Sequence, residues 1–138
     1  MTGSKLIVAL GVITMLVSAR PGLAHHSFAA EFDRDKPVTI GGVMTKMEWT
    51  NPHGWIYIDV KKPDGTLEHW SIEAGSPNQL IRRGLRKEDF PIGSELLITG
   101  YRARNGANTA AGETIKFVKD GRNFFMGSGN GPGTDAGN

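Results

Sequence analysis

The chain has 138 residues, with 16 basic and 14 acidic side chains, 19 glycines and no cysteine. The absence of cysteine excludes disulfides, catalytic thiols, zinc–thiolate sites and iron–sulfur clusters built from this chain. The length suits one small domain whose core needs no covalent staples.

Residues 1–24 are typical of a secretory signal peptide. The basic residue Lys5 precedes an apolar run at 6–17, and a short segment follows in which Gly22 and Ala24 occupy the small-residue positions of a cleavage site. The run is shorter than the roughly 20 residues that a membrane-spanning helix needs, although an uncleaved membrane anchor is the alternative. We therefore expect Sec-type export to the periplasm or the medium, with cleavage after Ala24, or after Ala19 as second choice, and no stable anchor afterwards.

Cleavage would change the charge balance. The predicted leader contains Lys5 and Arg20 and no acid, so removing these two from the 16 basic residues leaves 14 against 14 acidic ones. With neutral histidines the mature chain has no net charge. The basic balance of the precursor therefore gives no reason to expect a nucleic-acid partner.

The first part of the mature chain is predicted to be an N-terminal arm at 25–37, in which Phe28 and Phe32 are candidate anchors. A long first strand is predicted at 38–49. Its apolar residues change parity at Gly41-Gly42, which indicates a bulge and a bend at these glycines.

Two strands at 55–61 and 67–73 are predicted to form a hairpin around a tight turn at 62–65. One register places apolar residues opposite one another on the inward face. It pairs Ile56 with Ile72 and Ile58 with Trp70, and on the outward face it pairs Tyr57 with Ser71 and Asp59 with His69.

A short helix at 77–83 is predicted next, with Ser76 as its N-cap, Gly84 as its end, and Leu80 and Ile81 facing inward. The remaining predictions are a strand at 94–102, a hairpin loop at 103–112, a strand at 113–118, aromatic residues at 124–125 that close one end of the core, and a disordered glycine-rich tail at 127–138.

The order of three strands, one helix and two strands predicts an all-β domain with one short helix. An OB-fold-like five-stranded barrel over residues 38–126 fits this order, and a small open β-sandwich is the alternative.

Histidine positions suggest a metal site. Cleavage after Ala24 would give His25 a free amine with a pKa of about 7.7–8.0, so that the amine and the ring of one residue could chelate an ion. His26 offers a second mode through the intervening amide. His53, in the turn at 50–54, is the internal candidate, and His69 ranks behind it. Such all-nitrogen ligation favours copper(II), and no other cofactor is expected.

Each of these residues also has a structural explanation. An N-terminal histidine pair is equally consistent with a solvated chain end, and His53 with a hydrogen bond inside its own turn. Asp59 could hold His69 as an ordinary cross-strand pair. No nucleophile motif, metal-protease helix or paired carboxylates are present, so an enzyme is not favoured.

A ligand face is the competing functional interpretation. Its candidate residues surround the turn and the second strand, namely Trp49, Asn51, Trp55 and Tyr57, with His69 and Ser71 beside them. Tryptophans in such positions more often pack in the core or at a sheet edge than form a ligand platform.

The chain resembles a family of small exported bacterial proteins classed as a domain of unknown function. The resemblance rests on His25-His26-Ser27 directly after the leader and on Asn51-Pro52-His53 after the first strand. It implies a periplasmic location and a single β domain, and it implies no activity.

Two hypotheses follow. The first is a periplasmic domain that binds a divalent metal, copper(II) above all, and serves metal handling with another periplasmic protein. The second is a metal-free binding or assembly module for a peptide, a glycan or a partner protein. The sequence does not indicate an oligomeric state.

Overall fold

The computed structural model describes residues 28–127. The predicted leader, His25, His26 and residues 128–138 of the predicted tail lie outside this range. The strands are β1 Phe32–Glu48, β2 Trp55–Lys61, β3 Leu67–Glu73, β4 Glu95–Ala103, β5 Thr109–Phe117 and β6 Asn123–Phe125, and the helices are α1 Phe28–Glu31, α2 Pro77–Arg82 and the 3-10 helix η1 Lys87–Asp89. Within 28–127, no helix has the length and apolarity that crossing a membrane would require.

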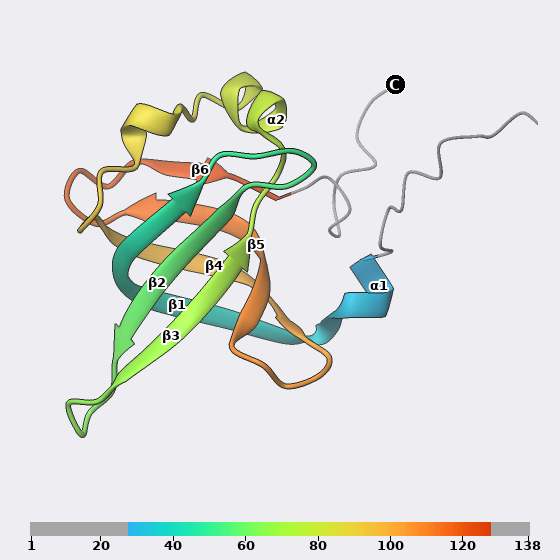
Figure 1. Ribbon diagram of the computed structural model, residues 1–138, viewed down its shortest axis with the longest axis vertical. Coiled ribbons are helices and arrows are strands. Elements are labelled where there is room, and N and C mark those ends of the chain that lie inside the picture. Colours follow the sequence, from blue (N-terminus) through green and yellow to red (C-terminus); the bar gives the residue numbers. More distant parts are fainter. Residues whose placement is uncertain (1–27, 128–138) are drawn as a thin grey trace, which may run out of the picture.

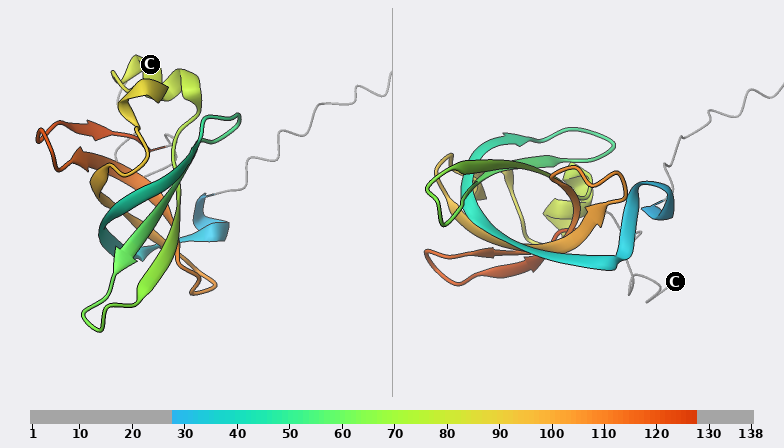
Figure 2. Two further views of the ribbon diagram at one scale, coloured as in Figure 1. Left: turned by 60° about the vertical axis from the view of Figure 1, so that its left-hand side comes forward. Right: turned by 90° about the horizontal axis from the view of Figure 1, so that it is seen from below.

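Five strands form a closed ring (Figures 1 and 2). Hydrogen-bonded neighbours follow the order β3-β2-β1-β4-β5-β6, and a parallel pairing between β3 and β5 closes the ring. Helix α2 follows β3 and lies over one end of the ring, while β6 pairs with the later part of β5, beyond the residues that pair with β3. The predicted all-β fold with a short helix is confirmed, and the closure matches the OB-like arrangement rather than an open sandwich.

The β2–β3 hairpin has the predicted strand bounds and register. Gly65 adopts a left-handed conformation with φ of 86°, and the Lys62 amide donates to the Thr66 carbonyl at 2.8 Å, which closes the turn. The predicted pairs are all present: Ile56 with Ile72, Ile58 with Trp70, Tyr57 with Ser71, and Asp59 with His69. The first two pairs are buried in the core, as their alternation required.

Strand β1 begins six residues earlier than predicted. Phe32 pairs with Ala103 of β4 and is buried with Ala103 and Ala111 in a small cluster, so the described part of the predicted arm is α1 followed by strand. The expected anchoring by Phe28 and Phe32 is confirmed, because both rings contact each other and Phe28 packs edge-on against Tyr101. Charged residues at 33–36 concealed the strand from a pattern based on apolar alternation.

The irregularity in β1 lies elsewhere than predicted. Pairing with β4 runs unbroken through Gly41 and Gly42 and is irregular only earlier, between Phe32 and Pro37. Pairing with β2 shifts between Met44 and Lys46. The glycine at 42 serves a close approach instead. A Cβ there would lie 2.4 Å from the Asp59 carbonyl oxygen, so β2 could not come so near to any other residue.

Helix α2 starts as predicted and differs on its buried face. Ser76 accepts from the Gln79 amide, the Gln79 side chain accepts from the Ser76 amide, and Gly84 with φ of 89° follows the helix. Leu80 is fully buried in the core, but Ile81, predicted to face inward, is 45% exposed. The short helix turns only one apolar side chain toward the ring.

The β4–β5 connection is shorter than predicted. Strand β5 starts at Thr109 rather than 113, so the loop contains only residues 104–108. Ala110 and Ala111 are buried strand residues, and their small side chains hid the strand from a search for bulky apolar alternation. This early part of β5 also makes the parallel pairing with β3.

Candidate functional site

The β1–β2 turn that carries His53 is fastened to the end of β3. The Gly54 amide donates to the Gly75 carbonyl at 3.0 Å, and the Ala74 amide donates to the Gly54 carbonyl at 2.8 Å. Inside the turn, the Thr50 hydroxyl donates to the His53 carbonyl at 3.2 Å. The backbone around His53 is therefore held at a fixed place beside β3.

His53 faces a carboxylate. Its Nδ1 lies 3.6 Å from Oε1 of Glu73, the last residue of β3. The Nδ1 atom is buried and has no hydrogen-bond partner, although the His53 side chain as a whole is 29% exposed. A distance of 3.6 Å exceeds the usual 2.7–3.2 Å range for a hydrogen bond from nitrogen to oxygen, so this buried nitrogen calls for an explanation. The ring has one further nitrogen, Nε2.

His69 does not join His53. Its Nδ1 lies 2.5 Å from Oδ1 of Asp59, and its side chain is 78% exposed on the outward face of the hairpin. His69 lies four positions before Glu73 along β3, which corresponds to about 13 Å. Within residues 28–127 no group of three or more metal-ligating side chains is present. His25 and His26 lie outside the described residues.

The aromatic candidates do not share one surface. Trp49 is half-buried and packs against the main core, with its ring centroid 6.2 Å from that of Phe90. Asn51 is exposed in the turn. Trp55, at the start of β2, is half-buried and lines a cleft of about 380 Å³ between α1 and the β4–β5 loop. Trp49 thus serves packing, and Trp55 borders open space.

Tyr57 belongs to a small polar cluster on the outward face. Its hydroxyl donates to Glu48 at 3.2 Å, and the Lys46 ammonium lies 5.2 Å from its ring centroid and 2.5 Å from Glu48. Burial raises the pKa of Tyr57, and the Glu48 charge adds to this. The hydrogen bond from Lys46 lowers the pKa of Glu48. These three residues satisfy one another and provide no vacant donor set.

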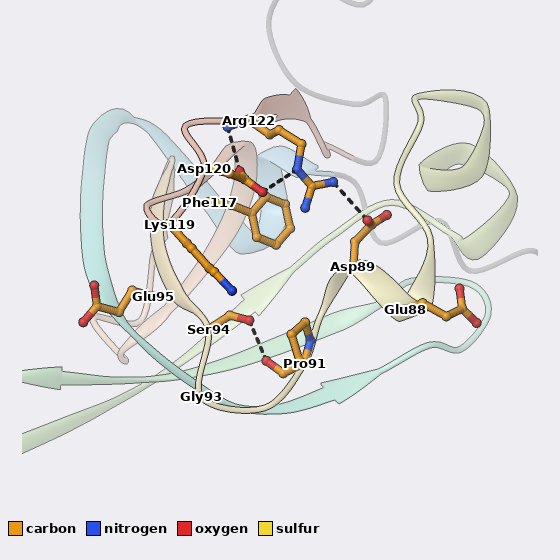
Figure 3. A pocket seen from close by; sticks show the side chains of 10 residues that line it. All are labelled: Glu88, Asp89, Pro91, Gly93, Ser94, Glu95, Phe117, Lys119, Asp120 and Arg122. Atoms are coloured by element: carbon orange, nitrogen blue, oxygen red, sulfur yellow. Dashed lines mark hydrogen bonds and ion pairs between the residues drawn. The ribbon is translucent and has the colours of Figure 1, made fainter.

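A second hollow, of about 490 Å³, lies between η1, the start of β4 and the β5–β6 turn (Figure 3). Figure 3 shows Arg122 between Asp89 and Asp120, which it contacts at 3.0 and 2.8 Å, while its guanidinium lies 4.9 Å from the Phe117 ring centroid. Hydrogen bonds to Asp89 and Asp120 raise the pKa of Arg122. The arrangement fastens the β5–β6 turn to η1, and neither His53 nor His69 lines this hollow.

Comparison with protein families shows to which family the chain belongs. The model of DUF6152, a family of unknown function, matches residues 13–112. The chain belongs to this family. No curated protein matches it, and no solved structure matches it. The matched segment of this DUF6152 member includes His53, Glu73 and Trp55, so the features described above lie within the shared region.

Glu73 is the site residue that sequence reasoning missed. It was one carboxylate among several without a spacing motif. The hairpin register contained the necessary signal, because pairing Ile56 with Ile72 also pairs Trp55 with Glu73, two residues from His53. Extending the register by one pair would have placed the carboxylate beside the turn of this DUF6152 chain.

Proposed function

We propose that this chain is the precursor of an exported β domain that binds a divalent metal ion, copper(II) above all, for metal handling with another periplasmic protein. The proposed ligands are the amine and ring of His25, freed by cleavage after Ala24, and the ring of His53, with His26 as an alternative donor. An all-nitrogen set of this kind suits copper(II).

The contact between His53 and Glu73 carries the proposal. Metal-binding histidines commonly present one ring nitrogen to the ion and turn the other toward a carboxylate, which fixes the ring and its tautomer. Nδ1 of His53 faces the Glu73 carboxylate at 3.6 Å in a buried position. Nε2 is then the nitrogen that serves as ligand, and a small movement of the ring on metal binding would close the contact to Glu73.

The path of the chain supports the role of His25. Glu73 pairs with Ala111 of β5. Ala111 belongs to the small cluster with Phe32 and Ala103, and Phe28, the first residue of α1, packs against this cluster. Both views agree that α1 lies on the same side of the ring as the β1–β2 turn (Figures 1 and 2). Three residues from 25 to 28 span up to about 10 Å. His25 can therefore reach a ligand that lies within about this distance of Phe28.

Copper titration of the mature protein, followed by electron paramagnetic resonance, tests the proposal. We expect His53→Ala to weaken copper(II) binding by about tenfold or more and to change the spectrum, because one nitrogen ligand is lost. His69→Ala is the matched control and should leave both unchanged. Glu73→Gln should weaken binding by about 10- to 100-fold, which is the usual effect of removing a partner of a ligand.

The amine provides the decisive variant. One glycine placed before His25 removes the amine from the chelate ring and leaves every side chain in place. If this extended protein binds copper with the same affinity and spectrum, the proposed site is wrong. The intact mass of the exported protein shows independently whether cleavage creates His25 as the first residue.

A further inference from the structure

The cleft beside Trp55 is built from three separate parts of the chain. Its lining comes from α1 and the start of β1, from Trp55 on β2, and from the β4–β5 loop with its flanking strand residues. Figure 1 shows α1 and this loop, in orange, at the same edge of the ring. Its volume of about 380 Å³ lies at the small end of the range for ligand sites, which is about 300–1,000 Å³.

Hydrogen bonds fix the walls of the cleft. The Arg104 amide donates to the Glu31 carbonyl at 2.9 Å, and the Arg104 Nε donates to the Ala29 carbonyl at 2.7 Å. These two bonds tie the loop to α1. Asn105 accepts from the Ala107 amide at 3.0 Å, which shapes the loop itself. The cleft therefore exists without a ligand and needs little reorganisation to receive one.

The lining combines one aromatic wall with uncharged hydrogen-bonding groups. Trp55 supplies the indole, and Asn105 and Thr109 supply an amide and a hydroxyl. The charges do not favour an anion: Arg104 already uses its Nε and lies 3.9 Å from Asp33, and Glu31 adds a carboxylate to the lining. A suitable ligand has an apolar face for the indole and a hydroxylated edge for the amide and hydroxyl.

We propose that this cleft binds a neutral sugar ring stacked on Trp55, with Asn105 and Thr109 as hydrogen-bonding groups. Sugar rings have the two features that the lining requires, and five-stranded rings of this type offer such loops to oligosaccharides. The inference does not depend on metal, because none of its residues is a proposed metal ligand.

The test is a titration of metal-free mature protein with neutral tetrasaccharides. These are the α-linked and the β-linked tetrasaccharide of glucose and the tetrasaccharide of N-acetylglucosamine. Binding is followed through tryptophan fluorescence and through the indole N–H signal of Trp55 in nuclear magnetic resonance spectra. We expect a saturable shift of that signal for at least one sugar. Trp55→Ala should reduce the affinity by roughly tenfold or more, as expected on removing an aromatic stacking platform.

Three controls make the result decisive. Trp55→Phe keeps an aromatic platform and should retain binding even if Trp55→Ala fails to fold. Trp49→Phe should bind like the parent protein, because Trp49 packs against Phe90 in the core. An acidic sugar, tetragalacturonate, should bind more weakly than the neutral ones. The proposal is overturned if no neutral sugar shifts the Trp55 signal, or if tetragalacturonate binds as tightly.

Discussion

Two adjacent glycines in β1 offer a sharp test of how closely β1 and β2 approach each other. A Cβ on Gly42 would lie 2.4 Å from the Asp59 carbonyl oxygen and 2.5 Å from the Ile58 side chain, and real Cβ atoms essentially never come closer than 3.0 Å. A Cβ on Gly41 would lie 3.5 Å from the Leu97 side chain, which is an ordinary contact. Gly42→Ala must therefore displace β2, whereas Gly41→Ala displaces nothing.

The magnitudes follow from overpacking. Forcing an extra methyl into a packed interior costs about 1–3 kcal/mol, and the upper half of that range applies to Gly42 because one of the obstructing atoms is backbone. For a domain of this size, 1 kcal/mol corresponds to about 4–8 °C in Tm, so we expect Gly42→Ala to lower Tm by roughly 8–24 °C. Gly41→Ala should leave stability unchanged or raise it by up to about 1 kcal/mol, since alanine restricts the unfolded chain.

Thermal and urea unfolding of both variants, monitored by circular dichroism, measures the difference. Equal stability of the two variants, within about 0.5 kcal/mol, would refute the close approach of β1 to β2 at Gly42. An unchanged dependence on urea is the control that both variants unfold the same amount of surface.

Three further variants test packing and charge. Leu80→Ala should destabilise the protein by about 2–5 kcal/mol, because the Leu80 side chain is fully buried. Ile81, in contrast, is 45% exposed, so Ile81→Ala should change stability by less than about 0.5 kcal/mol in the same unfolding experiments. Similar losses for the two variants would contradict the observation that Leu80 alone faces the core. Arg122→Gln tests stability in acid. The pKa of Asp89 is lowered first by a hydrogen bond from the Arg86 amide and in addition by Arg122. The Asp89 carboxylate therefore stabilises the fold above its unfolded pKa of about 3.9, and this contribution is lost as the pH falls through the lower pKa of the folded state. The Tm difference between parent and Arg122→Gln should be largest near neutral pH and shrink toward about pH 2–3; a constant difference would show that Arg122 acts through ring packing alone.

The sequence predicted the elements whose residues alternate strictly. In the β2–β3 hairpin, large apolar residues recur every second position and the turn contains proline, aspartate and glycine, so bounds and register were both correct. The shift of parity in β1 was also foreseen, but at Gly41-Gly42 instead of Thr45. A glycine indicates either a bulge or a close approach. Only the neighbouring strand distinguishes them, and its position is a tertiary fact.

The helix shows a similar limit. Leu80 and Ile81 are adjacent apolar residues, and periodicity in a six-residue helix cannot show which of them faces the ring. Capping signals are local and therefore succeeded: Ser76, Pro77 and Gly84 bound the helix as predicted. Local chemistry thus determined where the helix lies, while the direction of its face depended on its packing against the core.

The strand segment next to the candidate site was predicted to be part of a loop. Residues 109–112, Thr-Ala-Ala-Gly, look like part of a loop because small side chains carry no apolar alternation. The fold requires these small side chains. A Cβ on Gly112 would lie 2.2 Å from the Met126 side chain, and Ala111 packs in the small cluster with Phe32 and Ala103, against which Phe28 of α1 also packs. This segment pairs in parallel with the end of β3, which places Ala111 opposite Glu73, the residue whose carboxylate faces Nδ1 of His53. Small side chains that resemble a loop in the sequence therefore close the ring beside the candidate site.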